Sequence, residues 1–366
     1  MHARPRHSPR RLGAAFLALG LAACSSIGPA TVARDRIDYL GSLGNSWKQQ
    51  TLLNIVKLRY GDVPIFLEVT QVIAGYQLQT TVAGGVTAGN STAGIVGPFV
   101  VSGTAGAQNT YTDRPTVIYS PLMGVEFLKQ LMTPIPPSAV LFLLQSGYSA
   151  KLSLLMVLDS INGVNNEVRR GVPRPADPRF TRLVALLTEL QQSGSVETRI
   201  ERPKEGGETS LMVFGPSRDP QIAAKREEIR GLLGLKRQIG DLQVRYGGYS
   251  GKDDEIDLMT RSMLQVMLEL AATVQVSEVD VAAGRAAPGL VDAQPAGVLG
   301  SPLVTILSGD SAPKDACVAV EYHGHWFWIP DTDIQSKYSF GFVMLLFSIS
   351  GTGVKGGAPV VTVPTN

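Results

Sequence analysis

Two histidines near the C-terminal end of the chain are the side chains whose spacing comes nearest to a reactive site. His323 and His325 flank Gly324, and residues two apart on a strand face the same side. If Asp331 or Asp333 folded back toward them, the group could begin a metal site. The alternative is a hairpin turn at Gly324, followed by packed aromatic residues. Two ligands are too few for a metal site and the spacing fixes no third, so the sequence favours the turn and predicts no metal and no cofactor.

Other spacings that look catalytic lack the context that the chemistry needs. Ser311 and Lys314 have the Ser-x-x-Lys spacing of acyl-transfer enzymes, in which both side chains lie on one helical turn. Pro313 lies between them and Gly309 precedes them, so we expect a loop. Residues 246–252 are rich in glycine and end in lysine, but they lack the first glycine of a phosphate-binding loop. No catalytic residue is predicted, and an enzyme is the weaker hypothesis.

The first residues have the pattern of an export signal. Residues 1–11 contain four arginines and no acid, and residues 12–20 are an apolar run shorter than the roughly 20 residues that span a bilayer. Together with the small residues that follow, this pattern predicts a signal peptide over residues 1–23. Leu21 to Cys24 read Leu-Ala-Ala-Cys and resemble the lipobox of bacterial lipoproteins. The resemblance implies cleavage before Cys24 and attachment of lipid to its thiol, and two or more acyl chains make such an anchor stable.

Removal of the signal peptide changes the charge of the chain from +2 to −2, because only four arginines leave. The mature chain then has no net basic charge for nucleic acid, and we expect no such partner. Ser25 and Ser26 follow the cysteine, with no aspartate at the second mature position. By analogy with enteric bacteria, this predicts an outer-membrane lipoprotein that faces the periplasm. Cys317 is the only other cysteine, so no disulfide is expected within the fold, and its apolar neighbours predict that it is buried.

The interval from Val69 to Thr112 contains no charged residue, although Glu68 and Asp113 bound it. Two segments within it alternate between apolar or small residues and polar or small residues, and a glycine-bounded turn separates them. Each arm can supply the roughly 9–11 residues of a tilted strand that crosses a bilayer. Because open strand edges are not tolerated in lipid, such a hairpin would need a ring of copies that share one barrel. The alternative is a soluble hairpin or flexible loop, which the weak hydrophobicity of glycine and alanine favours.

The rest of the chain predicts an α+β fold, because its strands come in hairpins between helices instead of alternating singly with them. We expect a lipidated tether over residues 24–39 and a helix that opens at the capping-box sequence Ser46 to Gln49. Two α+β domains follow. The N-terminal domain covers residues 40–166 and includes the uncharged hairpin 69–112. A polar, proline-bearing linker marks its end, and the C-terminal domain covers residues 167–366.

Two segments resemble a family of uncharacterised proteobacterial lipoproteins. The first is Asp113–Leu122 with the residues that follow as far as Pro136, and the second is Tyr322–Ile329 with Asp333–Lys337 behind it. The resemblance spans nearly the whole mature chain and implies placement in the envelope, but no activity. We therefore expect a lipid-anchored structural or assembly component, with a homo-oligomeric membrane hairpin as one form of it. A periplasmic envelope hydrolase or ligand-binding lipoprotein is the alternative.

Overall fold

A computed structural model of the chain describes residues 27–73, 76–89, 100–113, 115–122, 124–201, 209–215, 218–236, 241–286 and 302–350. Helices and strands are mixed in these residues, and neighbouring strands are antiparallel except for β9 (Asp241–Tyr246) and β10 (Glu255–Thr260). The predicted α+β class is therefore confirmed. Cys24 and the signal peptide lie outside the described residues.

Contacts divide the chain into two compact units with limits that differ from the expected domains. Unit 1 runs as far as Pro64 and resumes at Gln130, whereas unit 2 comprises Ile65–Lys129. The boundary expected at residues 166/167 thus falls inside unit 1. No helix among those described is long and apolar enough to cross a membrane.

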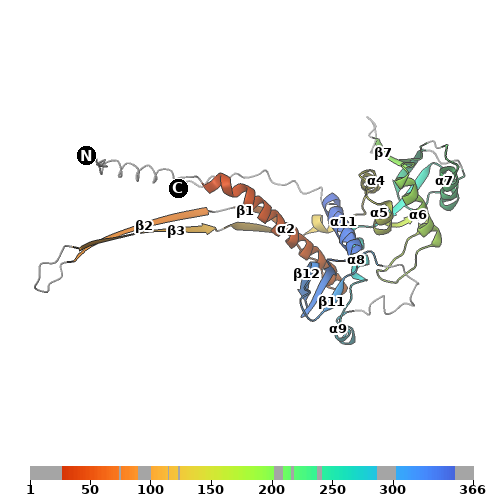
Figure 1. Cartoon of the computed structure of the whole chain (residues 1–366). Coiled ribbons are helices and arrows are strands. Elements are labelled where there is room, and N and C mark those ends of the chain that lie inside the picture. The colour runs from red at the N-terminus through yellow and green to blue at the C-terminus, as the bar shows by residue number, and fades with distance from the viewer. Residues whose placement is uncertain are drawn as a thin grey trace, which may run out of the picture. The chain divides into compact units, whose positions relative to one another are not determined.

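The larger sheet of unit 1 has six strands in the order β6-β5-β10-β9-β8-β7. Beside β9 and β10, its strands are β5 (Leu158–Ile161), β6 (Val164–Asn165), β7 (Glu197–Glu201) and β8 (Thr209–Val213). The helices that accompany this sheet are α4 (Pro137–Gln145), α5 (Ala150–Val157), α6 (Pro178–Gln192) and α7 (Pro220–Leu233). Figure 1 shows α4, α5, α6 and α7 gathered near β7.

Helix α6 illustrates how the sequence forms these elements. Asp177 caps it by accepting a hydrogen bond from the Arg179 backbone N–H, and Pro178 occupies the first turn, where its missing N–H costs nothing. Leu183, Leu186 and Leu190 recur at helical spacing and are fully buried. Their burial, more than helix propensity, accounts for the stability of the helix.

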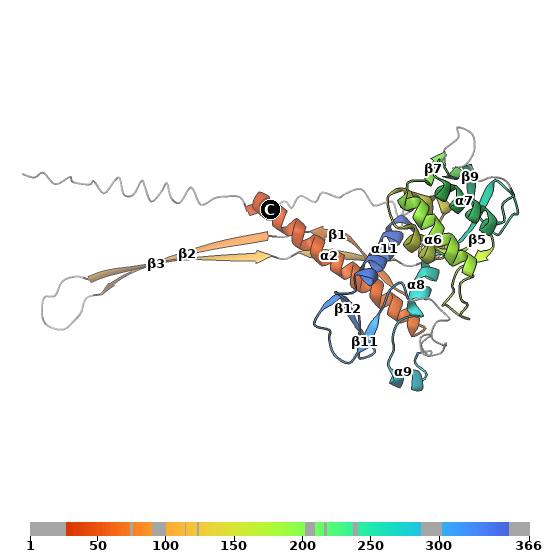
Figure 2. The same cartoon turned by 45° about the vertical axis from the view of Figure 1, so that its right-hand side comes forward.

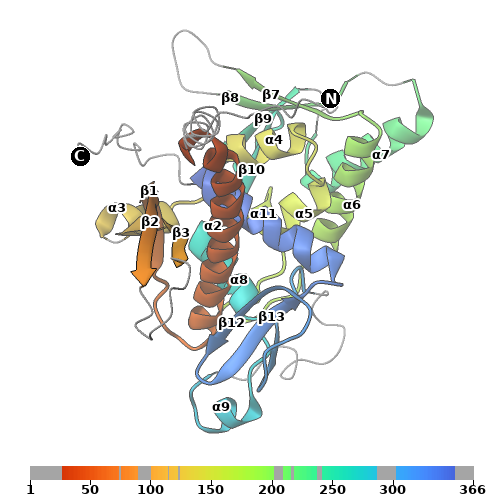
Figure 3. The same cartoon turned by 60° about the vertical axis from the view of Figure 1, so that its left-hand side comes forward.

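A second part of unit 1 combines one long helix with a small sheet. Its helices are α2 (Ile27–Arg59), α8 (Met263–Ala271), α9 (Glu278–Ala282) and α11 (Ile334–Ser350). Its sheet has the order β11-β13-β12, with β11 (Leu307–Gly309), β12 (Ala316–Tyr322) and β13 (His325–Pro330). Figure 3 shows α2 beside α8, with its C-terminal end next to β12. Leu52, Ile55 and Val56 of α2 are fully buried there.

Helix α2 corrects two sequence predictions. It begins at Ile27 and not at Ser46, so the capping-box sequence lies inside the helix, and residues 27–39 of the expected tether are part of the helix. Gly41 and Gly44 each cost about 1 kcal/mol relative to alanine in a helix interior. That cost does not end the helix, because nothing between Pro29 and Arg59 blocks the backbone hydrogen bonds.

Unit 2 is built on one long hairpin. Strand β1 (Phe66–Ile73) pairs with β4 (Thr116–Leu122), and β2 (Tyr76–Gly89) pairs with β3 (Val100–Asp113), both antiparallel. Helix α3 (Val125–Met132) follows β4, as its sequence predicts. The uncharged interval of the sequence therefore forms strands and not a flexible loop within its described part.

Candidate functional site

The β2–β3 ribbon is the most unusual feature of unit 2 (Figure 1). Fourteen residue pairs run without a register shift from Tyr76↔Asp113 to Gly89↔Val100. The last pair of the β1–β4 ladder is Ile73↔Thr116, three residues away along both strands. The pairs of the β1–β4 ladder from Gln71↔Ile118 onward therefore have the same register as the β2–β3 ladder.

The pairing of β2 with β3 places the apolar series of one arm opposite the apolar series of the other. Val82 pairs with Ala107, so the positions of the apolar series on both arms share one face of the ribbon. Thr81 pairs with Gln108 on the opposite face. Of the side chains described on that face, Gln79, Thr81, Gln108 and Thr110 are exposed and Thr112 is half-buried. The predicted alternation of the two arms is thus reproduced by the backbone pairing.

The outer edges of the ribbon carry none of the features that usually prevent strands from pairing with other chains. Such features include charged residues, prolines and bulges. The β1–β4 ladder has all three, namely Glu68, Pro121 and a register shift between Val69 and Gln71. Strands β2 and β3 have no proline and no register shift, and Asp113 in the first pair is their only charge. In the described residues, β2 and β3 pair only with each other, so each has an open edge.

Two tyrosines mark one end of the ribbon. Tyr76 is in the first pair, and Tyr111 pairs with Leu78 two positions further along. The register therefore places both aromatic residues at the same end and on the same face. Interfacial aromatic residues of membrane proteins gather in this way at one level of the bilayer. Phe99, at the start of the expected return arm, lies outside the described residues.

His323 lies in a tight turn and His325 begins the strand after it, as the hairpin interpretation predicts. His323 and Gly324 link β12 to β13 with φ values of +50° and +79°. Positive φ at both central positions is what a type I′ turn requires. The carboxylates considered as further ligands are engaged elsewhere, since Asp331 binds Lys337 at 2.6 Å and Asp333 binds Ser336 at the start of α11. Within the described ranges, no group of three or more His, Cys, Asp or Glu side chains could hold a metal ion.

His325 instead belongs to a polar cluster at the end of α2. Its Nδ1 lies 2.9 Å from Asp310, and its Nε2 lies 3.7 Å from the buried Asp280. Tyr60 donates a hydrogen bond of 2.6 Å to Asp280, and Arg285 donates another of 2.7 Å. The bond from Tyr60 is the main cause that lowers the pKa of Asp280, while burial and the same bond raise the pKa of Tyr60. The cluster thus holds one buried carboxylate ionised and ties α2 to β13 and α9.

A second contact from the same segment reinforces this tie. Tyr322 donates a hydrogen bond to Asp62, and burial together with this bond raises the pKa of Tyr322 to about 12. The ring of Tyr60 packs 5.1 Å from that of His323 and 5.5 Å from that of Tyr322. These contacts hold the turn between β12 and β13 against the C-terminal end of α2.

The remaining motifs occupy ordinary positions. Ser311 and Lys314 lie in the loop between β11 and β12, outside any helix, as expected. Residues 247–254 connect β9 to β10, and Lys252 of that loop forms an ion pair with Glu255 at 2.8 Å. Cys317 is a free, half-buried thiol in β12 instead of the fully buried residue predicted. Strand β12 is an edge strand of the small sheet, so one side of Cys317 stays partly exposed.

One cavity of about 630 Å³ bears on the ligand-binding alternative. It lies among α4, α5, α6, β7 and β8, and both apolar and amide side chains line it, including Leu154, Leu187 and Gln191. The amide of Gln191 already bonds main-chain groups of Leu144, Tyr148 and Ala150. Gln191 is therefore already engaged within the protein, whereas Gln145, Gln192 and Glu197 also line the cavity.

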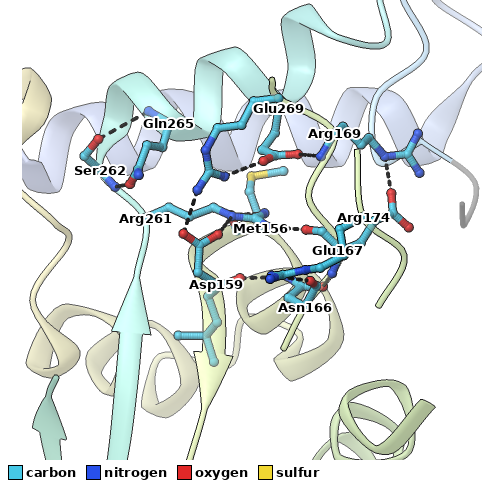
Figure 4. A network of polar contacts seen from close by, with 12 residues as sticks. Met156, Asp159, Asn166, Glu167, Arg169, Arg174, Arg261, Ser262, Gln265 and Glu269 are labelled. Atoms are coloured by element: carbon cyan, nitrogen blue, oxygen red, sulfur yellow. Dashed lines mark hydrogen bonds and ion pairs between the residues drawn. The ribbon is translucent and has the colours of Figure 1, made fainter. Parts of the chain in front are cut away.

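A buried network of charged residues in unit 1 was not predicted from the sequence (Figure 4). Arg261 is only 3% exposed, and its Nε donates to Asp159 at 2.8 Å. Its Nη1 atom donates to the carbonyls of Leu155 and Met156, at the C-terminal end of α5, and its Nη2 donates to the carbonyl of Glu167. The guanidinium group thereby joins α5, the start of α8 and the segment after β6.

A second arginine extends the network to the segment expected to be a linker. Arg170 donates to Asp159 at 2.6 Å and also to Glu269 of α8. The Arg169 backbone N–H donates to Glu269 at 2.7 Å. Burial alone would raise the pKa of Asp159, but the hydrogen bonds from Arg170 and Arg261 outweigh it and lower the pKa. Residues 166–174 are consequently held against the core.

The chain matches no protein-family model, no curated protein and no solved structure. The resemblance to uncharacterised proteobacterial lipoproteins stays a prediction, and the functional argument depends on the geometry described above.

Proposed function

We propose that this protein is a lipid-anchored component of the outer membrane that assembles with copies of itself through its hairpin. In this proposal several copies pair edge to edge through β2 and β3, and the resulting ring of ribbons crosses the membrane. The observation that carries the proposal is the uncharged, bulge-free β2–β3 ladder with two open edges. The anchor is lipid on Cys24, and the body of the protein faces the periplasm.

The length of the ladder fits a membrane crossing. Each strand has 14 residues, and a tilted strand needs roughly 9–11 residues to cross a bilayer. Apart from Asp113 in the first pair, every position of both strands is uncharged. The apolar series would face lipid, and the series with Gln79, Thr81, Gln108 and Thr110 would face a polar interior.

Pairing with other copies would supply hydrogen-bond partners for the two open edges of the ribbon. A two-stranded hairpin is at best marginally stable in water, and the glycines of β2 and β3 weaken it further. In lipid, each backbone group on an open edge would cost several kcal/mol. If β3 of one copy pairs with β2 of the next, the contact repeats head to tail and can close into a ring without open edges.

A shortened hairpin tests the assembly. In the test variant, Asn-Gly replaces residues 82–107, which leaves the six pairs from Tyr76↔Asp113 to Thr81↔Gln108. In the control, Asn-Gly replaces residues 90–99 and all fourteen pairs remain. We expect the wild type and the control to be oligomers by native mass measurement in detergent and to conduct in planar bilayers. The shortened variant should be a monomer without conductance, because six residues per strand cannot span the bilayer.

The same measurements can contradict the proposal. A wild-type protein that is monomeric and never conducts would mean that the hairpin is a soluble arm. An oligomer that persists in the shortened variant would place the self-contact elsewhere in the chain.

The anchor is tested separately. Cys24→Ala should abolish acylation, because no other residue of the lipobox-like segment can form the thioether to lipid. Intact mass of the protein extracted from membranes checks this, with Cys317→Ala as the matched control that keeps the lipid. An unchanged lipid mass in Cys24→Ala would exclude Cys24 as the attachment site.

A further inference from the structure

The first half of α2 is a helix whose apolar residues are not covered by the protein. Val32, Ile37 and Leu40 are 63%, 70% and 61% exposed, and Trp47 is 37% exposed. The second half differs, since Leu52, Ile55 and Val56 are fully buried. In Figures 1 and 2, the N-terminal half of α2 extends away from the other helices of unit 1.

These exposed residues form one face. At 3.6 residues per turn, Val32, Ile37, Leu40, Leu43 and Trp47 lie on the same broad side of the helix. The opposite side carries polar and charged residues, namely Arg34, Asp35, Asp38, Ser42, Asn45 and Gln49. The first half of α2 is therefore amphipathic, with its apolar side toward solvent.

This face partly continues the buried face further along the helix. Ile55 and Asn54 lie eighteen residues, or five full turns, after Ile37 and Arg36, and both are buried. Leu52 and Val56 lie five turns after Arg34 and Asp38, so the buried side also extends toward the charged side of the first half. In the first half of α2 the apolar face is exposed, so it is open to an occupant outside the described residues of the chain.

We infer that this occupant is the membrane surface and that residues 32–47 of α2 lie in the lipid interface beside the acyl anchor. The inference uses the proposed lipidation of Cys24, from which only Ser25 and Ser26 separate Ile27. A lipidated cysteine keeps the start of α2 at the headgroups, so its apolar face meets lipid first. Helices of this kind bury their apolar side about 5–10 Å into the headgroup and acyl boundary.

The composition of the face fits lipid better than a second helix. The face is broad and includes Trp47, an aromatic type enriched at membrane interfaces. Leu40, Leu43 and Trp47 alone have the heptad spacing of a coiled coil, but Arg36 interrupts that stripe, and Val32 and Ile37 widen the face beyond it. Arg36 lies within the apolar side, where its long stem can extend its charge to the headgroups.

Spin labels on the two sides of the helix test the inference in the acylated, full-length mature protein. Leu40→Cys and the control Ser42→Cys are each made with Cys317→Ser, so that the label has one site, because Cys24 is blocked by lipid. The proteins are reconstituted into vesicles of phosphatidylethanolamine and phosphatidylglycerol. Accessibility to oxygen, which concentrates in lipid, and to a water-soluble nickel chelate is then measured.

We expect the label at position 40 to be accessible to oxygen and protected from nickel, at a depth of about 5–10 Å, and the label at position 42 to show the reverse. Equal access of nickel to both labels would overturn the inference. Protection of position 40 from both reagents would also overturn it, because protein would then cover the face. Intact mass of each sample reports acylation independently, so a failure of the anchor is distinguished from a failure of the interfacial helix.

Discussion

Val82→Arg is expected to destabilise the membrane-inserted assembly by about 2–4 kcal/mol and to abolish its conductance. Val82 pairs with Ala107 near the middle of the β2–β3 ladder and belongs to the apolar series. In the proposed ring this position lies near the bilayer midplane, where an arginine cannot reach either interface. The measurement is unfolding in lipid vesicles, together with native mass and single-channel recordings.

Two matched variants separate the effect of membrane depth from that of charge alone. Thr81→Arg places the same charge one residue away on the polar series, where it should be tolerated and change only conductance. Val101→Arg lies on the apolar series but pairs with Ala88, next to the last pair of the ladder. Val101→Arg should destabilise the membrane-inserted assembly by only about 0–1 kcal/mol, because its charge lies near an interface. Equal costs at positions 82 and 101 would contradict a depth-dependent environment and favour a soluble ribbon.

Arg261→Met is expected to reduce the free energy of unfolding of unit 1 by about 3–5 kcal/mol. The substitution removes a buried guanidinium that binds Asp159 and three main-chain carbonyls. Asp159 keeps Arg170, but it loses one of its two charged partners, and the three carbonyls each lose a donor, although that of Leu155 keeps Asn166. Denaturant unfolding of the detergent-solubilised protein measures the loss.

Arg182→Met is the control for this variant, because Arg182 forms an exposed ion pair with Glu228. Pairs of that kind contribute about 0–1 kcal/mol. If both variants lost the same stability, the network of Arg261 would be no more important to the fold than a surface ion pair.

The network also predicts a dependence of stability on pH. The pKa of Asp159 is lowered in the folded protein from its usual value of 3.8, so folding favours the ionised carboxylate. The resulting stability is fully present above that usual value and is lost as the pH falls through the lower, folded pKa. In Asp159→Asn, the free energy of unfolding should fall less steeply as the pH is lowered through this range. If the fall is the same as in the wild type, Asp159 is not a source of the pH dependence.

The sequence by itself determined those features that depend on residues close together in the chain. Helix α6 is an example, since Asp177 and Pro178 mark its start and its leucines recur at helical spacing, and such signals act within one or two turns. The His323–Gly324 turn and the two arms of the hairpin were also predicted, since alternation has a period of two residues. The two alternating series fix which faces of β2 and β3 lie together, but a shift of two residues would preserve that match, so the register itself came from the structure.

Only the tertiary structure decided the features that join distant residues. Arg261 meets Asp159 across 102 positions of the chain, and no local pattern distinguishes these residues from solvated charges. Helix α2 extends back to Ile27 although Ser46 begins a good capping sequence, because a cap indicates where a helix can start and does not stop one already formed. The open edges of the ribbon were equally invisible in the sequence, because whether a strand has a neighbour depends on which other strands fold beside it.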